Sequence, residues 1–165
     1  MADNSNRTAL LVIDMQKDFI HEDGLSRVNG GRAVVPNVIK AVQVARQRGI
    51  LIVWGSVGAE LVDGLVIKEG DYKLVKMRFS AFFATHLHSL LQGAGINNLV
   101  ITGVQTPNCI RQTVFDAVAL DYQSVTVIVD ATAAATPDIH VANIFDMKNV
   151  GVATPTLQEW CESNT

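Results

Sequence analysis

The chain has 165 residues, of which 48% are hydrophobic and 18% charged, and it carries a formal net charge of −3 at pH 7. This length suits one domain with one core, so we expect a single domain over 1–165 with peripheral tails at 1–8 and 156–165. The weak negative charge argues against nucleic-acid and anionic-membrane partners and favours a small-molecule ligand. Two cysteines, no secretory signal and no membrane-length apolar run make the cytoplasm the expected compartment.

Four apolar segments of strand length occur in order along the chain, and helical patterns separate them. The expected strands cover 9–13, 50–54, 99–102 and 125–129, with a short last strand at 150–153, and the expected helices cover about 35–48, 81–92, 107–120 and 137–147. This alternation predicts an α/β fold with three layers, in which helices cover both faces of a doubly wound, mainly parallel sheet. Ligands of such Rossmann-like folds bind at the carboxyl ends of the strands. The stretch 55–71 contains four glycines and follows the second strand, so we expect a substrate loop there.

Cys109 stands where a buried strand is expected to end and a helix to begin. Thr106 is a suitable N-cap for that helix, and Pro107 suits its first position. The unpaired amides and the positive end of the helix dipole favour a thiolate at this place. The alternative is a buried cysteine that acts only as a small hydrophobic residue.

Three polar residues from distant parts of the chain are expected at the same edge of the sheet. Asp14 follows the first strand, Lys76 lies in Lys-Leu-Val-Lys at 73–76, and Cys109 follows Gly103. A carboxylate can take the proton of a neighbouring thiol, and an ammonium keeps that carboxylate ionised while it stabilises charge on sulfur. Taken singly, Asp14 has the alternative of a turn carboxylate and Lys76 that of a solvated edge lysine.

Three segments resemble the signature segments of the isochorismatase-like cysteine hydrolases, the superfamily that includes the nicotinamidases. They are Leu-Val-Ile-Asp-Met-Gln-Lys-Asp-Phe at 11–19, Val-Lys-Met-Arg-Phe-Ser-Ala-Phe at 75–82 and Gly-Val-Gln-Thr-Pro-Asn-Cys-Ile at 103–110. The similarity extends from about residue 9 to about residue 155. The resemblance implies an isochorismatase-like fold, a homo-oligomer (dimer or tetramer) and, because the cysteine is present, hydrolysis of a small amide or related C–N bond through a thioester.

The resemblance also assigns roles to individual residues. It implies a catalytic triad of Asp14, Lys76 and Cys109, and a cis peptide bond between Val104 and Gln105. The backbone N–H groups of Gln105 and Cys109 would form the oxyanion hole. The residues implied for substrate binding are Phe19, Phe79, Phe82 and Thr106.

The chain departs from the nicotinamidase pattern after the second strand. Nicotinamidases carry an Asp-x-His and a further histidine there that bind a divalent metal, whereas this chain has no histidine between His21 and His86. We therefore expect no metal and no cofactor. The connection is also shorter than in the family, which predicts a missing pocket wall and poorer substrate positioning.

The remaining polar residues near the motifs have structural explanations. His86 and His88 are two apart in a helical pattern and therefore point to different faces, which is unsuitable for metal binding. The residues Asp18, His21 and Asp23 are expected to form a solvated loop, and Arg111 and Gln112 either reach a substrate carboxylate or lie on the helix surface.

Three hypotheses about function remain open. The first is a metal-independent cysteine hydrolase that acts on a small amide. The second is a catalytically inactive relative of nicotinamidase with a binding or interaction role. The third is a redox-responsive protein, because the features that activate Cys109 for attack also favour its oxidation.

Overall fold

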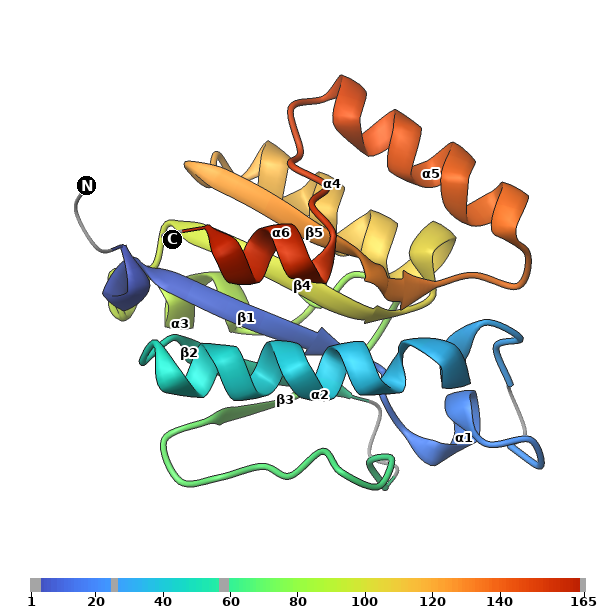
Figure 1. Ribbon diagram of the computed structural model, residues 1–165. Coiled ribbons are helices and arrows are strands. Elements are labelled where there is room, and N and C mark those ends of the chain that lie inside the picture. The colour runs from blue at the N-terminus through green and yellow to red at the C-terminus, as the bar shows by residue number, and fades with distance from the viewer. Residues whose placement is uncertain (1–3, 25–26, 57–59, 164–165) are drawn as a thin grey trace.

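The computed structural model describes residues 4–24, 27–56 and 60–163. In this part of the chain, five parallel strands form one sheet, with helices on both of its faces (Figure 1). The spatial order of the strands is β3-β2-β1-β4-β5. The strands are β1 (Thr8–Ile13), β2 (Leu51–Ser56), β3 (Tyr72–Val75), β4 (Asn98–Val104) and β5 (Ser124–Ala133). The α/β three-layer prediction is confirmed.

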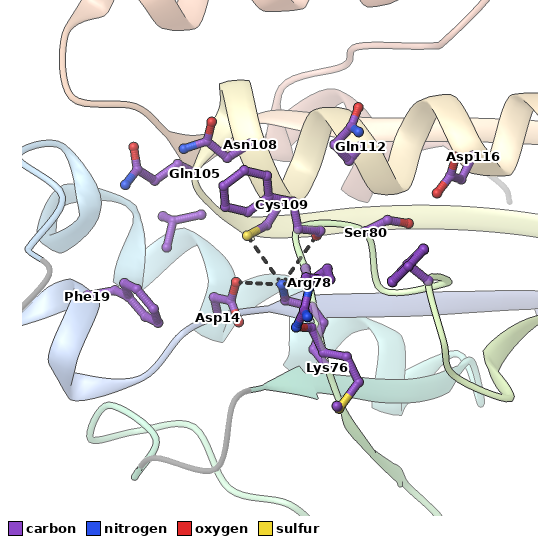
Figure 2. Close-up of a pocket in the computed structure, with 14 residues that line it drawn as sticks. Asp14, Phe19, Lys76, Arg78, Ser80, Gln105, Asn108, Cys109, Gln112 and Asp116 are labelled. Carbon is purple, nitrogen blue, oxygen red and sulfur yellow. Dashed lines mark hydrogen bonds and ion pairs between the residues drawn. The ribbon is translucent and has the colours of Figure 1, made fainter.

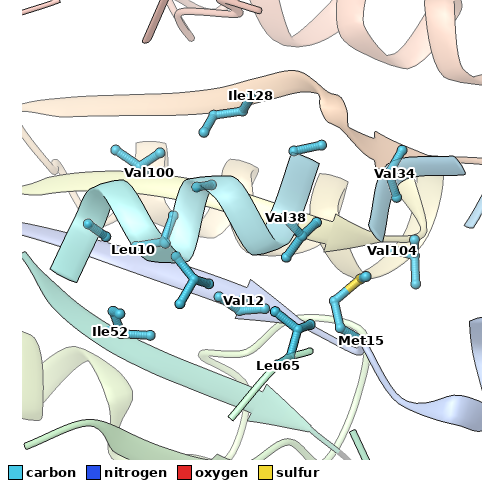
Figure 3. Packing of buried hydrophobic residues seen from close by; sticks show 14 of the residues in the cluster. Leu10, Val12, Met15, Val34, Val38, Ile52, Leu65, Val100, Val104 and Ile128 are labelled. Carbon is cyan, nitrogen blue, oxygen red and sulfur yellow. The ribbon is translucent and has the colours of Figure 1, made fainter. Parts of the chain in front are cut away.

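The side chains of the central strands alternate between two cores because successive residues of a strand face opposite ways. All six residues of β1 are buried. Leu10 and Val12 pack under α2 (Gly31–Gln47), as Figure 3 shows, whereas Leu11 and Ile13 face the opposite core. The helices on the α2 side are α2 and α6 (Leu157–Glu162), and those on the other side are α3 (Leu87–Gly93), α4 (Arg111–Ala119) and α5 (Pro137–Asn149).

Three short helical segments complete the fold. They are the 3₁₀ turn Ser5–Arg7, α1 (Lys17–Ile20) directly after β1, and the π-helical turn η2 (Thr106–Ile110) between β4 and α4. None of the helices in the described part of the chain is both long and apolar enough to cross a membrane.

The strand order reverses next to β1. The chain adds β2 and β3 on one side of β1 and then crosses to the other side to form β4 and β5. The carboxyl ends of β1 and β4 therefore diverge into loops at the topological switch point, where open α/β sheets bind their ligands. Asp14 and Gln105 are the first residues after these two strands.

Several expected elements differ from the structure. The helix expected at 81–92 begins only at Leu87, because Ala84 adopts a positive φ of 54° that interrupts a right-handed helix. The last strand expected at 150–153 is reduced to a single bridge between Thr126 and Ala153. Sequence analysis did not identify β3 as a strand, although it pairs with β2 over four residues.

Part of the C-terminal segment expected to be a peripheral tail packs into the core. Thr156 and Glu159 form a capping box that begins α6, and Trp160 in this helix is 2% exposed within the core under α2. The expected tail at 156–165 is therefore wrong for α6. Thr8, expected in the first tail, is the buried first residue of β1.

Candidate functional site

A pocket of about 690 Å³ opens at the carboxyl ends of β1, β3 and β4. Asp14, Lys76 and Cys109 lie at its base, as Figure 2 shows. Apolar side chains contribute much of the remaining wall, namely Phe19, Met77, Phe79, Phe83 and Val104. The polar lining comes from Arg78, Ser80, Gln105, Asn108, Gln112 and Asp116.

The ammonium of Lys76 lies between the carboxylate and the thiol. Its Nζ is 3.3 Å from Asp14 Oδ2 and 3.3 Å from Cys109 Sγ (Figure 2). The side chains of Lys76 and Asp14 are only 2% and 3% exposed. Nζ also donates to the backbone carbonyl oxygens of Arg78 and, at 3.2 Å, Phe79. The structure therefore brings together the three residues that the sequence places at one sheet edge.

Backbone hydrogen bonds fix the positions of these side chains. The Asp14 N–H donates to the carbonyl of Gly55 at 3.0 Å, and the Lys76 N–H donates to Ser56 at 2.9 Å, so both residues are tied to the end of β2. Asp14 has a positive φ of 51°, a conformation that aspartate tolerates better than most residues. The Thr113 hydroxyl donates to the Cys109 carbonyl at 2.7 Å.

A glycine lets the two central strands approach each other beside the site. Gly103 has a φ of 115°, and a Cβ built on it would lie 2.0 Å from the Ile13 carbonyl oxygen. No side chain fits there without moving the backbone, so this position holds the ends of β1 and β4 together. Gly103 belongs to the third motif, but its spacing alone did not indicate this role.

Burial dominates the electrostatics of the thiol and the carboxyl group. Loss of solvation and, after it, the negative charge of Asp14 raise the pKa of Cys109, Lys76 opposes both effects, and the net result is a pKa of about 12. Burial likewise raises the pKa of Asp14 above its usual 3.8, against the lowering effects of Cys109 and Lys76. The resting sulfur is thus a thiol, and the expectation that the helix start favours a thiolate is wrong.

The turn that carries Cys109 differs from the expected first turn of an α-helix. The Ile110 N–H bonds to the Gln105 carbonyl at 3.2 Å, which closes a wider π turn. Thr106 is not an N-cap, since its hydroxyl lies 2.7 Å from His140 Nδ1 on α5. The peptide bond between Val104 and Gln105 is cis.

The aromatic residues expected in substrate binding occupy different places. Phe19 and Phe79 line the pocket, and so does Phe83, which sequence analysis did not single out. Phe82 does not line it, because its ring packs against His88 and Tyr122. The buried Thr106 is also outside the pocket lining. Phe79, Phe82 and Phe83 carry the same side chain and lie close together in the sequence, so only the path of the loop before α3 decides which of them line the pocket.

The other polar candidates lie apart from the pocket, with one exception. His86 is the N-cap residue of α3, and His88 Nδ1 lies 2.9 Å from the Tyr122 hydroxyl. Arg111 turns to α5, where it pairs with Asp146 at 2.6 Å, while Gln112 lines the pocket.

Two findings concern the acidic and histidine side chains more widely. His21 and Asp23, but not Asp18, line a separate hollow. No group of three or more His, Cys, Asp or Glu side chains within 4–24, 27–56 and 60–163 is arranged to hold a metal ion.

Comparison with known proteins identifies close relatives over nearly the whole chain. A probable inactive nicotinamidase of Arabidopsis thaliana is 60% identical over 193 aligned positions, which cover 98% of each chain. The ureidoacrylate amidohydrolase RutB of Enterobacter sp. (strain 638) is 30% identical over 94% of this chain and 88% of its own length. The crystal structure of an isochorismatase family protein from Desulfovibrio vulgaris superimposes with a TM-score of 0.90, at 34% identity over 93% of this chain and 96% of that one.

The family model of the isochorismatase domain matches residues 8–55 and 52–159, which together span all five strands and the pocket. The three motif segments lie inside these matches. The chain therefore belongs to the isochorismatase family.

Proposed function

We propose that the protein hydrolyses a C–N bond of a small amide or ureide, with Cys109 as nucleophile, Asp14 as general base and acid, and Lys76 as the group that stabilises their charges. The observation that carries this proposal is the position of Lys76 Nζ, 3.3 Å from both the carboxylate and the sulfur at the base of the pocket. A nucleophile, a base and a charge-stabilising group in contact are the arrangement that covalent catalysis requires.

In the first half of the reaction, the two oxygens of Asp14 have different tasks. Oδ2 is held by Lys76, whereas Oδ1 has no hydrogen-bond partner in the described part of the chain. Oδ1 is thus available to accept the proton of Cys109 as sulfur attacks the carbonyl carbon. The S–C bond forms, the carbonyl electron pair moves to oxygen, and the C–N bond then breaks as Asp14 protonates the leaving nitrogen.

The second half of the reaction releases the acid. Asp14 takes a proton from a water molecule, whose oxygen attacks the thioester carbon. The S–C bond breaks, the carboxylic acid leaves, and Asp14 returns the proton to the Cys109 sulfur. In both halves the backbone N–H groups of Gln105 and Cys109 are the proposed donors to the oxyanion, a contribution typically worth about 10²–10³ in rate per donor.

The raised pKa of Cys109 favours this mechanism over a peroxide-sensing role. Oxidation to a sulfenic acid proceeds from the thiolate, and a sensor cysteine is therefore expected to have a lowered pKa. Here burial and Asp14 raise it to about 12. In hydrolysis, by contrast, a neighbouring base removes the proton only as the sulfur attacks.

An inactive, ligand-binding protein is the second candidate, and two observations favour it. The relative with 60% identity is named a probable inactive nicotinamidase. Its 193 aligned positions exceed the 165 residues of this chain, and the two parts of the family match meet at 52–55, within β2. These findings support the expectation of a shortened connection after β2. A smaller wall would weaken substrate positioning while leaving the nucleophile intact.

Ammonia release from a panel of primary amides and ureides tests the proposal. The panel includes nicotinamide and ureidoacrylate, which the names of the relatives suggest. We expect turnover that Cys109→Ala abolishes and Asp14→Asn lowers steeply, with a thioester adduct on Cys109 in acid-quenched samples. Cys161→Ala is the matched control, since this second cysteine is half-buried beside α2 and outside the pocket. Equal ammonia release by the Cys109→Ala variant, or none from any compound, would overturn the proposal.

A further inference from the structure

One wall of the pocket is a single face of the helix that follows the nucleophile. Cys109, Gln112 and Asp116 are spaced three and four residues apart, so their side chains lie on the same face. All three line the pocket, and Figure 2 shows them in a row, with Gln112 between Cys109 and Asp116. At a rise of about 1.5 Å per residue, the carboxylate begins about 10 Å from the nucleophile. The pocket is thus elongated along α4.

The carboxylate of Asp116 is the unusual group in this row. It is half-buried in the pocket wall, yet within the described residues it takes part in none of the ion pairs and accepts no side-chain hydrogen bond. Neither of the two cations that line the pocket forms an ion pair with it, because Lys76 pairs with Asp14 and the Arg78 guanidinium donates to the Met77 carbonyl at 2.7 Å. Within the described residues, the carboxylate at the distal end of the pocket is therefore not held in an ion pair.

Aromatic side chains accompany this charge. Phe79 and Phe83 line the same pocket and are 58% and 59% exposed, which is high for large apolar residues. An exposed aromatic face attracts cations, and a carboxylate nearby attracts them further. The same rings offer an apolar surface to a chain that joins the two ends of a ligand. An ammonium or guanidinium group on an apolar spacer is the ligand chemistry that complements both features.

We infer that the substrates of this pocket are amides or ureides whose far end carries a cationic group, bound by Asp116 about 10 Å along α4 from the reacting carbonyl. The chemical step rests on the proposed function, but the charge preference does not. Asp116 is a specificity-determining residue.

Hydrolysis of a matched amide series tests the inference. Its members share one spacer and end in an ammonium, a hydroxyl or a carboxylate group. We expect kcat/KM to be highest for the ammonium compound and the ratio of ammonium to hydroxyl compound to fall about tenfold or more in Asp116→Asn. The change should appear mainly in KM, because the contact is the same in the ground state and the transition state. Asp116→Lys should reverse the order.

Glu69→Gln is the matched control. It removes the same charge from an exposed residue that does not line the pocket. The ratio should be unchanged in this variant and should decrease at high salt in the wild type. A ratio that is the same in Asp116→Asn and in the wild type would overturn the inference. The inference would also be overturned if the wild type preferred the carboxylate compound and Arg78→Gln removed that preference. Arg78 would then be the residue that binds the far end of the substrate.

Alkylation of Cys109 separates this inference from the proposed function. Iodoacetamide derivatives with the same three tails form an S–C bond as iodide leaves and the thiol proton passes to Asp14, and no hydrolytic turnover is needed. Faster labelling by the ammonium reagent, lost in Asp116→Asn, supports the charge preference even if no amide is hydrolysed. Hydrolysis without any tail preference in either assay would leave the proposed function standing and overturn the inference.

Discussion

Replacement of Lys76 by methionine should cost a large share of the free energy of unfolding. The substitution keeps the apolar stem but removes the ammonium 3.3 Å from Asp14, in a pair whose side chains are almost fully buried. Two unit charges at this separation attract by about 5 kcal/mol at an effective dielectric constant of about 20. Removal of one partner from a buried pair is destabilising by about 3–5 kcal/mol, because the remaining charge is left without compensation. We expect a loss in this range.

The loss should depend on pH in a defined direction. Without Lys76, the pKa of Asp14 rises further above its ordinary value of 3.8, so the folded variant binds a proton more tightly than the unfolded chain. Stability then falls as pH rises from about 3.8 through the folded pKa, and the deficit is smallest in acid. Urea unfolding at several pH values measures both effects.

A surface ion pair supplies the control for this experiment. Arg32 and Glu22 are 3.1 Å apart but 74% and 71% exposed, so Arg32→Met should cost at most about 1 kcal/mol. An equal loss in Lys76→Met and Arg32→Met would refute the reasoning. A deficit in Lys76→Met that grows on acidification would refute it too.

Three further predictions concern the thiol, the turn that carries it and the chain end. Asp14→Asn should shift the pH profile of Cys109 alkylation to lower pH, because it removes a negative charge that raises the pKa of the thiol. Hydrolysis should nevertheless be lost. An unshifted profile would contradict the role of Asp14 in raising the pKa of the thiol. Thr106→Val should leave His140 without its 2.7 Å partner and should lower both hydrolysis and the alkylation of Cys109. Thr106→Ser keeps the hydroxyl and should restore both rates. If the serine variant does not restore them, the hydrogen bond is not the cause. Trp160→Ala should lower the free energy of unfolding by about 3–5 kcal/mol in urea, and a loss below about 1 kcal/mol would contradict its placement in the core.

The central strands β1 and β4 could be predicted from the sequence because they are buried on both faces. β1 and β4 are nearly continuous apolar runs, and such runs between helical patterns indicate a parallel sheet. β3 has no comparable signal, since Leu74 is its one buried residue among four. β3 is a short and mostly exposed edge strand, so its pairing with β2 defines it, and this pairing is not visible in one sequence.

The candidate site, too, was predictable only in part: the sequence located its residues but not the effect of the folded surroundings on them. The motifs located Asp14, Lys76 and Cys109, because parallel strands deliver their carboxyl ends to one edge. The direction of the thiol pKa could not follow from the helix start, since burial outweighs the dipole once the pocket closes around the sulfur. Asp116 carries a local signal that could have been used, because it lies two helical turns from Cys109 on the same face.

A shortened connection after β2, as expected from the sequence, would affect the pocket wall more than the reacting groups. Asp71 closes the connection: its carboxylate accepts hydrogen bonds from the Arg46 guanidinium, the Trp54 indole at 2.9 Å and the Lys68 backbone at 2.9 Å. These bonds tie the residue before β3 to α2 and β2, so β3 pairs in register and places Lys76 beside Asp14.

The reacting groups and the wall therefore depend on different parts of the chain. Asp14, Lys76 and Cys109 follow β1, β3 and β4, whereas the shortening expected from the sequence falls between β2 and β3. A change of wall alters contacts that the substrate makes in both the ground state and the transition state, so it should raise KM rather than abolish the chemical step. We accordingly expect high concentrations of a small amide to separate weak binding from lost chemistry. Rates that still rise linearly with substrate and vanish in Cys109→Ala indicate a competent triad with a high KM.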